Sequence, residues 1–214
     1  PSAAHPLMTH LYLRLQAEYP KVRLNVREGQ GGELDAMLDT GSVDMAILFR
    51  YQKPASHDEH LLATAGTFLV SRPGDPLTRP VTIDFTRLEG LRLVLPRRPA
   101  HWRAVLDETA RSKGFTLQAE VEADSLKVQK QLVAHTPGLY SLLGSFSIAD
   151  ELRAGQLQVS RVVAPDLKRH VTLALPKQGQ LTAASRVVSR LIRETVAAWG
   201  HRLSEPEQPL ARPA

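Results

Sequence analysis

The sequence predicts an α/β protein built from two similar subdomains. Amphipathic helical segments alternate with apolar, strand-sized runs, which is typical of a parallel sheet with crossover helices. A turn-rich stretch, SRPGDPLTRP (71–80), divides the chain, and the same alternation resumes after it. The 214 residues suffice for one large domain or two small ones.

The first predicted element is an amphipathic helix over residues 6–19, whose apolar side chains recur at helical spacing. Leu13 and Ala17 lie on the opposite side of this helix and indicate a second contact surface. Residues 22–28 then alternate apolar and polar side chains, which predicts a half-exposed strand.

The remaining elements follow from apolar periodicity and from the glycines and caps that punctuate it. In chain order they are a glycine-opened helix ending at Gly41, a buried strand at 43–49, a strand at 91–96, a helix at 101–113, a strand at 115–122, a helix that Asp124 or Ser125 caps, a strand at 139–143, a helix near 146–153, strands at 157–163 and 170–175, and a long helix at 182–203. We expect the tail at 204–214 to be disordered, because it has no apolar period.

Composition excludes several functions. The chain has no cysteine, so thiol catalysis and thiolate metal sites are excluded. The longest apolar runs are strand-sized, which argues against a membrane span. The net charge is +5, but the basic residues are dispersed, aromatic residues make up only 5%, and no recognition helix is visible. We therefore expect this chain not to bind nucleic acid directly.

The enzyme motifs are incomplete. EGQGGEL (28–34) resembles a dinucleotide fingerprint, but Leu34 replaces its last glycine. His57 and His60 have no evident third metal ligand, so we interpret their surroundings as an exposed polar loop. LLGSFSI (142–148) lacks the spacing of a nucleophile elbow. We expect no catalytic residue, no metal and no cofactor.

The strand ends are the better candidates for a site, since open α/β sheets bind ligands beyond the carboxyl ends of their strands. Several of these ends also begin helices, whose free amides favour an anion. The sequence therefore predicts a site for a small anion, formed by Ser2, Gly31, Gly32, Arg50, Arg97, Arg98, Ser125 and Ser141.

The order of motifs resembles the effector-binding domain of LysR-type transcriptional regulators. The motifs that carry the resemblance are RLQAEYPKVRLNVREG (14–29), LDAMLDTGSVDMAIL (34–48), FLVSRPGDPL (68–77), LVAHTPGLYSLLG (132–144) and PDLKRHVTLALP (165–176). Each motif is weak by itself, but together they follow the family's order over nearly all of residues 1–200. Asp75 replaces the histidine that is usual in the family.

The resemblance implies a fold like that of a type 2 periplasmic binding protein. Two Rossmann-like subdomains with mixed, mostly parallel sheets would be joined by two crossing segments near 70–73 and 165–169. We expect the first subdomain to comprise 1–72 and 168–203, and the second to comprise 73–167.

The resemblance also implies a function and partners. The effector would occupy the cleft between the subdomains, in a cytoplasmic regulator whose N-terminal winged helix-turn-helix domain, absent from this chain, binds DNA. The domain would form homodimers through a surface that includes Leu13, Ala17, Arg23 and Asn25, and the full-length protein would form tetramers. The alternative is a periplasmic solute-binding protein of a transporter, which an export signal upstream of Pro1 would indicate.

Overall fold

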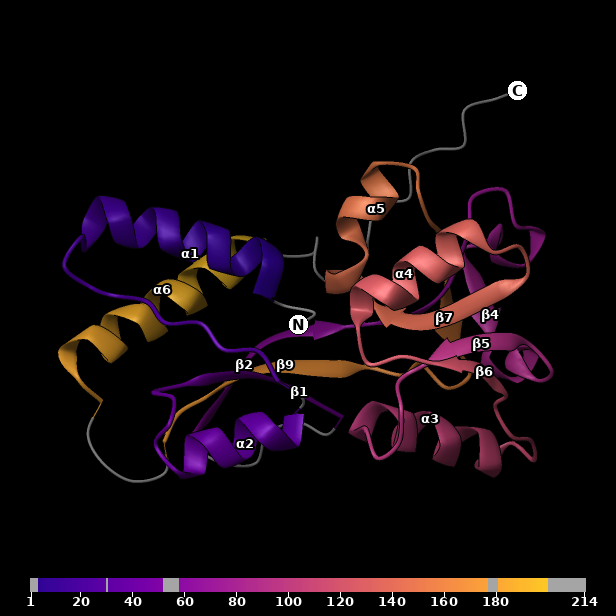
Figure 1. The fold of residues 1–214 in the computed structure, drawn as a ribbon, viewed down its shortest axis with the longest axis horizontal. Coiled ribbons are helices and arrows are strands. Elements are labelled where there is room, and N and C mark those ends of the chain that lie inside the picture. The colour runs from indigo at the N-terminus through magenta and orange to yellow at the C-terminus, as the bar shows by residue number, and fades with distance from the viewer. Residues whose placement is uncertain (1–3, 30, 52–57, 177–180, 200–214) are drawn as a thin grey trace. The chain divides into compact units, whose positions relative to one another are not determined.

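The computed structural model describes residues 4–29, 31–51, 58–176 and 181–199, drawn as ribbons in Figure 1. The chain divides into two compact units. Among the described residues, the first unit holds those up to Thr64 and those from Arg169 onward, and the second holds Ala65–Lys168. The predicted Ser2 contact, His57 and the tail at 204–214 lie outside the described residues.

The first unit is built on a three-stranded sheet in the order β1-β9-β2. β1 and β9 are antiparallel, with Leu48 opposite Thr172. The elements of this unit are α1 (Ala4–Glu18), α2 (Gly31–Asp39), β1 (Ala46–Arg50), β2 (Glu59–Ala65), β9 (Arg169–Ala174) and α6 (Ala183–Trp199).

The helix α1 packs against α6, as Figure 1 shows. Its buried face carries Leu7, Leu11 and Leu15, which repeat every four residues and are each at most 2% exposed. A polar contact also joins the two helices at the edge of their interface, where Arg14 Nη2 donates to Glu194 Oε2 over 2.9 Å. The predicted 6–19 helix is therefore confirmed, with its start moved to Ala4.

The predicted strand at 22–28 is wrong. The structure assigns no strand to these residues, although Val22 and Leu24 are half-buried between exposed neighbours. Alternation places side chains on two sides of an extended chain, but a strand also needs a partner for its backbone groups. In the part of the chain that the structure describes, no strand pairs with this segment.

The second unit contains a six-stranded mixed sheet in the order β4-β8-β3-β7-β5-β6. β3 lies antiparallel to both of its neighbours, whereas β5 lies parallel to β6 and β7, and β4 lies parallel to β8. The elements of this unit are β3 (Thr67–Ser71), β4 (Thr82–Asp84), β5 (Arg92–Leu95), α3 (His101–Ser112), β6 (Ala119–Glu122), α4 (Leu126–His135), β7 (Leu139–Gly144), α5 (Ala149–Arg153) and β8 (Gln158–Val163), with short 3-10 helices at Pro76–Thr78, Phe85–Leu88 and Ser145–Ser147.

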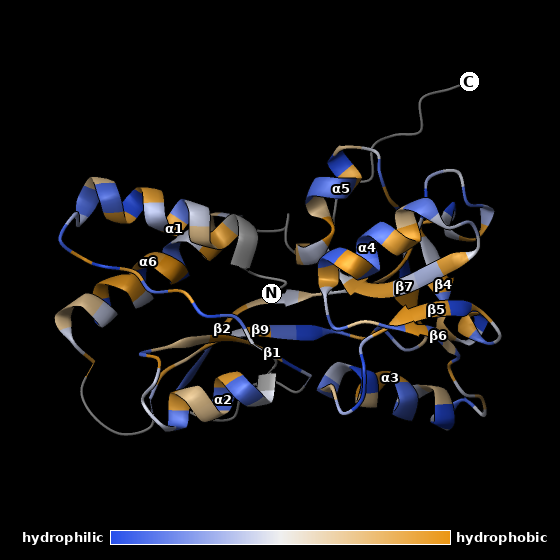
Figure 2. Ribbon diagram, in the orientation of Figure 1, coloured by the Kyte–Doolittle hydropathy of each residue, from blue (hydrophilic) through white to orange (hydrophobic). Residues whose placement is uncertain are grey.

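Apolar residues line β5 and β7, as Figure 2 shows. Leu93, Val94 and Leu95 are completely buried, because this part of β5 lies inside the sheet and α4 packs on it. Gly114, which was expected to end the preceding helix, adopts a φ of +88° just after α3. A left-handed residue at that point suits glycine, since a Cβ would be strained there.

The unit boundary differs from the predicted one. The chain enters the second unit at Ala65, not after residue 72. The reason is β3, which pairs with β7 and β8 and so belongs to the larger sheet. β2 was also missed: Glu59 and His60 belong to this strand, not to the exposed polar loop that we expected.

Candidate functional site

The second unit brings three strand ends to one edge of its sheet. β6, β5 and β7 are neighbours and run parallel, so their carboxyl ends lie on the same side. Arg97 and Arg98 follow β5, Ser125 follows β6, and Ser145 follows β7. Three of the predicted contacts, Arg97, Arg98 and Ser125, thus follow strands that end at one edge of the sheet.

Ser125 is the N-cap of α4. Its hydroxyl accepts a hydrogen bond from the Val128 amide over 3.4 Å, in the backbone conformation expected of a cap. Asp124 joins the two loops, because its carboxylate accepts from the Arg97 amide over 3.1 Å and forms an ion pair with the Arg97 guanidinium. The start of α4 is thereby held beside the end of β5.

A buried ion network lies next to this edge. Arg103, with only 3% of its side chain exposed, donates to Asp107, to Glu122 and to the Pro96 carbonyl. Arg98 binds the same Asp107 carboxylate over 2.7 Å. The network links α3 to the ends of β5 and β6. Sequence reasoning missed Arg103, although its four-residue spacing from Asp107 on a helix was a usable signal.

Ser141 is completely buried in β7. Its hydroxyl donates toward the Val94 carbonyl over 2.9 Å and toward Gln129 Oε1 over 3.2 Å. The Gln129 amide group in turn donates to the Ala123 carbonyl over 2.7 Å. These bonds attach the first turns of α4 to the sheet, so the visible role of Ser141 is to position that helix.

Arg50 ends β1 in the first unit, and carboxylates surround its guanidinium. Asp35 accepts from both terminal nitrogens, at 2.7 and 2.9 Å, and Glu59 accepts at 2.6 Å. The hydrogen bonds that Arg50 donates to Asp35, and then those to Glu59, raise the pKa of Arg50 above its ordinary value. The residue connects α2, β1 and β2.

Gly31 is the first residue of α2, and Gly32 follows it in the first turn. A Cβ added at Gly32 would meet no atom within 4 Å, so close packing does not require glycine there. Both residues place backbone amides at the start of this helix, where donors lack intrahelical partners.

Within residues 4–29, 31–51, 58–176 and 181–199, no three histidine, aspartate or glutamate side chains gather in a way that could hold a metal ion. None of the helices that the structure describes is long and apolar enough to cross a membrane.

Comparison with known proteins gives a consistent result. The family model of the LysR substrate binding domain matches residues 1–197. The nitrogen assimilation regulatory protein nac of Escherichia coli (strain K12) is 21% identical over 197 residues, which are 92% of this chain and 63% of that protein. The chain thus spans less than two thirds of this relative.

Solved structures share the fold. The CcmR regulatory domain of Synechocystis PCC6803, in complex with 2-PG, superposes with a TM-score of 0.78 at 15% identity, covering 91% of this chain and 93% of that one. The reduced form of OxyR superposes with a TM-score of 0.72 at 21% identity, covering 94% of this chain and 93% of its own.

Proposed function

The chain belongs to the LysR substrate binding domain family, and from this premise we propose that it binds a small anionic effector at the strand ends of the second unit. It is the regulatory, effector-binding domain of a LysR-type transcriptional regulator and not an enzyme. The type 2 periplasmic-binding-protein-like fold with mixed sheets is confirmed.

One observation carries the proposed site. α4 begins directly beyond β6, at the edge where the side chains of Arg97 and Arg98 remain 71% and 64% exposed. The start of a helix offers amide donors and partial positive charge, and guanidinium groups bind carboxylates and phosphates. The CcmR domain, which has this fold, binds 2-PG.

The proposed contacts are Arg97, Arg98 and Ser125. Gly31 and Gly32 remain predicted contacts from the first unit, through their backbone amides. Arg50 and Ser141 take supporting roles in this proposal, because carboxylates engage the former and the latter is buried under α4.

The test is calorimetry with an anion selected from a thermal-shift screen of small organic acids, since a ligand that binds only the native state raises its stability. Arg98→Ala and Ser125→Ala should each weaken binding about tenfold, the loss expected for a charge-assisted bond. Arg111→Ala, an exposed arginine on α3, is the control and should bind normally. Normal binding by both site variants would place the effector elsewhere.

We further propose that the domain forms homodimers through α1 and the segment at 22–28. Leu13 is 61% exposed and Val26 is 49% exposed, and Ala17, Arg23 and Asn25 are also exposed. A carboxylate buried in an apolar interface without a partner is costly. Leu13→Asp should therefore shift light-scattering mass toward the monomer, whereas an unchanged dimer would place the interface elsewhere.

We also propose that the complete protein acts in the cytoplasm, assembles as a tetramer and binds DNA through a winged helix-turn-helix outside this chain. The support is the family and the 63% coverage of the nac protein. Reading the coding sequence upstream of Pro1 tests this against the solute-binding alternative, which requires an export signal.

A further inference from the structure

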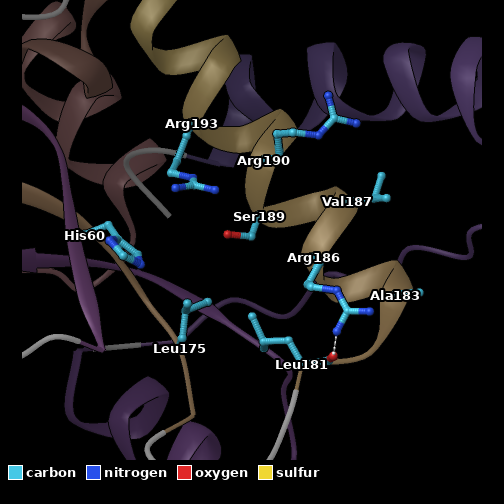
Figure 3. Close-up of a pocket in the computed structure, with 9 residues that line it drawn as sticks. All are labelled: His60, Leu175, Leu181, Ala183, Arg186, Val187, Ser189, Arg190 and Arg193. Carbon is cyan, nitrogen blue, oxygen red and sulfur yellow. Dashed lines mark hydrogen bonds between the residues drawn. The ribbon is translucent and has the colours of Figure 1, made fainter.

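A second candidate site lies in the first unit, between the sheet and α6. It is a cavity of about 510 Å³, shown in Figure 3. Its walls come from β2, from the residue that follows β9, and from α6 with the residue two positions before it. A volume of this size is within the range of small-molecule sites.

The cavity has an aliphatic part and a basic part. Leu175, Leu181 and Val187 supply the aliphatic surface. Arg186, Arg190 and Arg193 supply guanidinium groups, and their spacing of four and then three residues places them along one side of α6. A ligand that matched both parts would need an aliphatic body and a negatively charged group.

The three arginines differ in what already binds them. Arg190 donates to Glu194 over 3.1 Å and to the Tyr19 hydroxyl over 2.7 Å, and its side chain extends away from His60 in Figure 3. Arg186 donates to the Leu181 carbonyl over 2.6 Å, without a carboxylate. For Arg193, no hydrogen bond or ion pair is formed with any part of the chain that the structure describes.

A buried hydroxyl also faces the cavity. Ser189 is only 4% exposed, and its hydroxyl lies on the side of α6 that faces His60 in Figure 3. Within residues 4–29, 31–51, 58–176 and 181–199 this hydroxyl forms no hydrogen bond, and it is not among the fully buried atoms that lack a partner, so its oxygen keeps some exposure to the cavity. The Ser189 hydroxyl and the exposed Arg193 guanidinium are therefore both available to a ligand that enters the cavity.

We propose that this cavity binds a small aliphatic carboxylate. Its carboxylate group accepts hydrogen bonds from Arg193 and from the Ser189 hydroxyl, while Arg186 adds positive charge nearby. Its chain lies against Leu175, Leu181 and Val187. Because every lining residue belongs to the first unit, this site is separate from the effector contacts proposed on the second unit and does not depend on them.

Hexanoate is a suitable probe, because it joins a short aliphatic chain to one carboxylate. Titration of the 214-residue chain, followed by calorimetry, should show saturable binding. Acetate lacks the aliphatic body and 1-hexanol lacks the charge, so each should bind at least about tenfold more weakly. Equal binding of hexanoate and 1-hexanol would contradict the role given to the arginines.

Substitutions in the cavity test whether hexanoate binds there. Arg193→Gln should weaken hexanoate binding about tenfold, since it removes the charge but keeps a polar, though shorter, side chain. Ser189→Ala should weaken it by a smaller factor of about threefold, the effect of one hydrogen bond to a charged group in a partly open cavity. Arg111→Gln on α3, also an exposed arginine, is the matched control and should leave affinity unchanged.

Two results would overturn the proposal. One is the absence of saturable hexanoate binding. The other is unchanged affinity in both Arg193→Gln and Ser189→Ala. If Arg98→Ala weakens hexanoate while Arg193→Gln does not, the probe binds at the strand ends of the second unit, which contradicts this site and supports the effector site.

Discussion

The arginines at the strand ends of the second unit and those in the cavity of the first unit have different surroundings. Arg97, Arg98 and Arg103 each have a carboxylate partner within 3.1 Å. In the cavity Arg190 also pairs with a carboxylate, that of Glu194 at 3.1 Å, but Arg186 and Arg193 have no such partner among the described residues. The comparison shows that an arginine in a predicted site is not necessarily an arginine available to an anion.

Arginines therefore have different roles in the two places. At the strand ends, the guanidinium groups hold the loops and α3 together, and any anion must share them with Asp107 or Asp124. In the cavity, the exposed guanidinium of Arg193 has no partner in the described part of the chain, so we expect it to contribute little to stability. Mutation of Arg103 near the strand ends should therefore lower the stability of the domain, whereas mutation of Arg193 in the cavity should lower ligand affinity with little effect on stability.

The largest expected effect is at Arg103. Arg103→Ala should lower the free energy of unfolding by about 3 kcal/mol, because it leaves Asp107 and the Pro96 carbonyl without their buried donor. Urea denaturation measures the loss. Arg111→Ala removes an ion pair of exposed side chains on the same helix and should cost no more than about 0.5 kcal/mol. Equal losses of unfolding free energy in the two variants would contradict the structural role that we assign to the ion network around Arg103.

A second prediction concerns alkaline pH. Burial, followed by the hydrogen bond from its hydroxyl to Asp75, raises the pKa of Tyr140 to about 12 from its ordinary value of 10.0. Since the unfolded chain ionises first, the stability that neutral Tyr140 provides is complete below its ordinary pKa and is lost as the pH rises toward about 12.

The expected loss is about 1 kcal/mol between about pH 9 and pH 11. Denaturation of the wild type and of Tyr140→Phe at both pH values measures it, because the variant lacks the titrating group. If Tyr140→Phe loses the same amount of stability as the wild type, Tyr140 is not the cause. Tyr140 and Asp75 thus provide a second example, without an arginine, of a polar pair in the second unit that contributes to stability.

The smallest expected effect is at Arg193. Arg193→Gln should change the free energy of unfolding by less than about 0.5 kcal/mol, since an exposed side chain without partners is removed. Urea denaturation of Arg193→Gln and of Arg103→Ala under the same conditions compares the two losses of stability directly. A loss approaching that of Arg103→Ala would show that Arg193 has a structural partner, and the comparison of the two arginine groups would fail.

Elements with their own local signals could be predicted from the sequence. The leucines of α1 repeat at helical spacing, Ser125 caps α4, and Gly114 ends α3 in a left-handed conformation. Local periodicity and capping depend on residues close in sequence, so they can be recognised without knowledge of the fold. The grouping of Arg97, Arg98 and Ser125 followed from the same reasoning, because parallel strands end at one edge.

Only the tertiary structure decided which residues far apart in the sequence pair with one another, as strands or as ion pairs. The segment at 22–28 alternates like a strand but has no strand partner in the described chain, whereas β2, with Glu59 and His60 at its start, is a strand because β9 pairs with it. Arg50 was predicted to bind an anion and instead binds Asp35 and Glu59. The cavity joins His60 to residues beyond 175. Hydrogen bonds and ion pairs of this kind depend on which segments the fold brings together, and a single sequence does not contain that information locally.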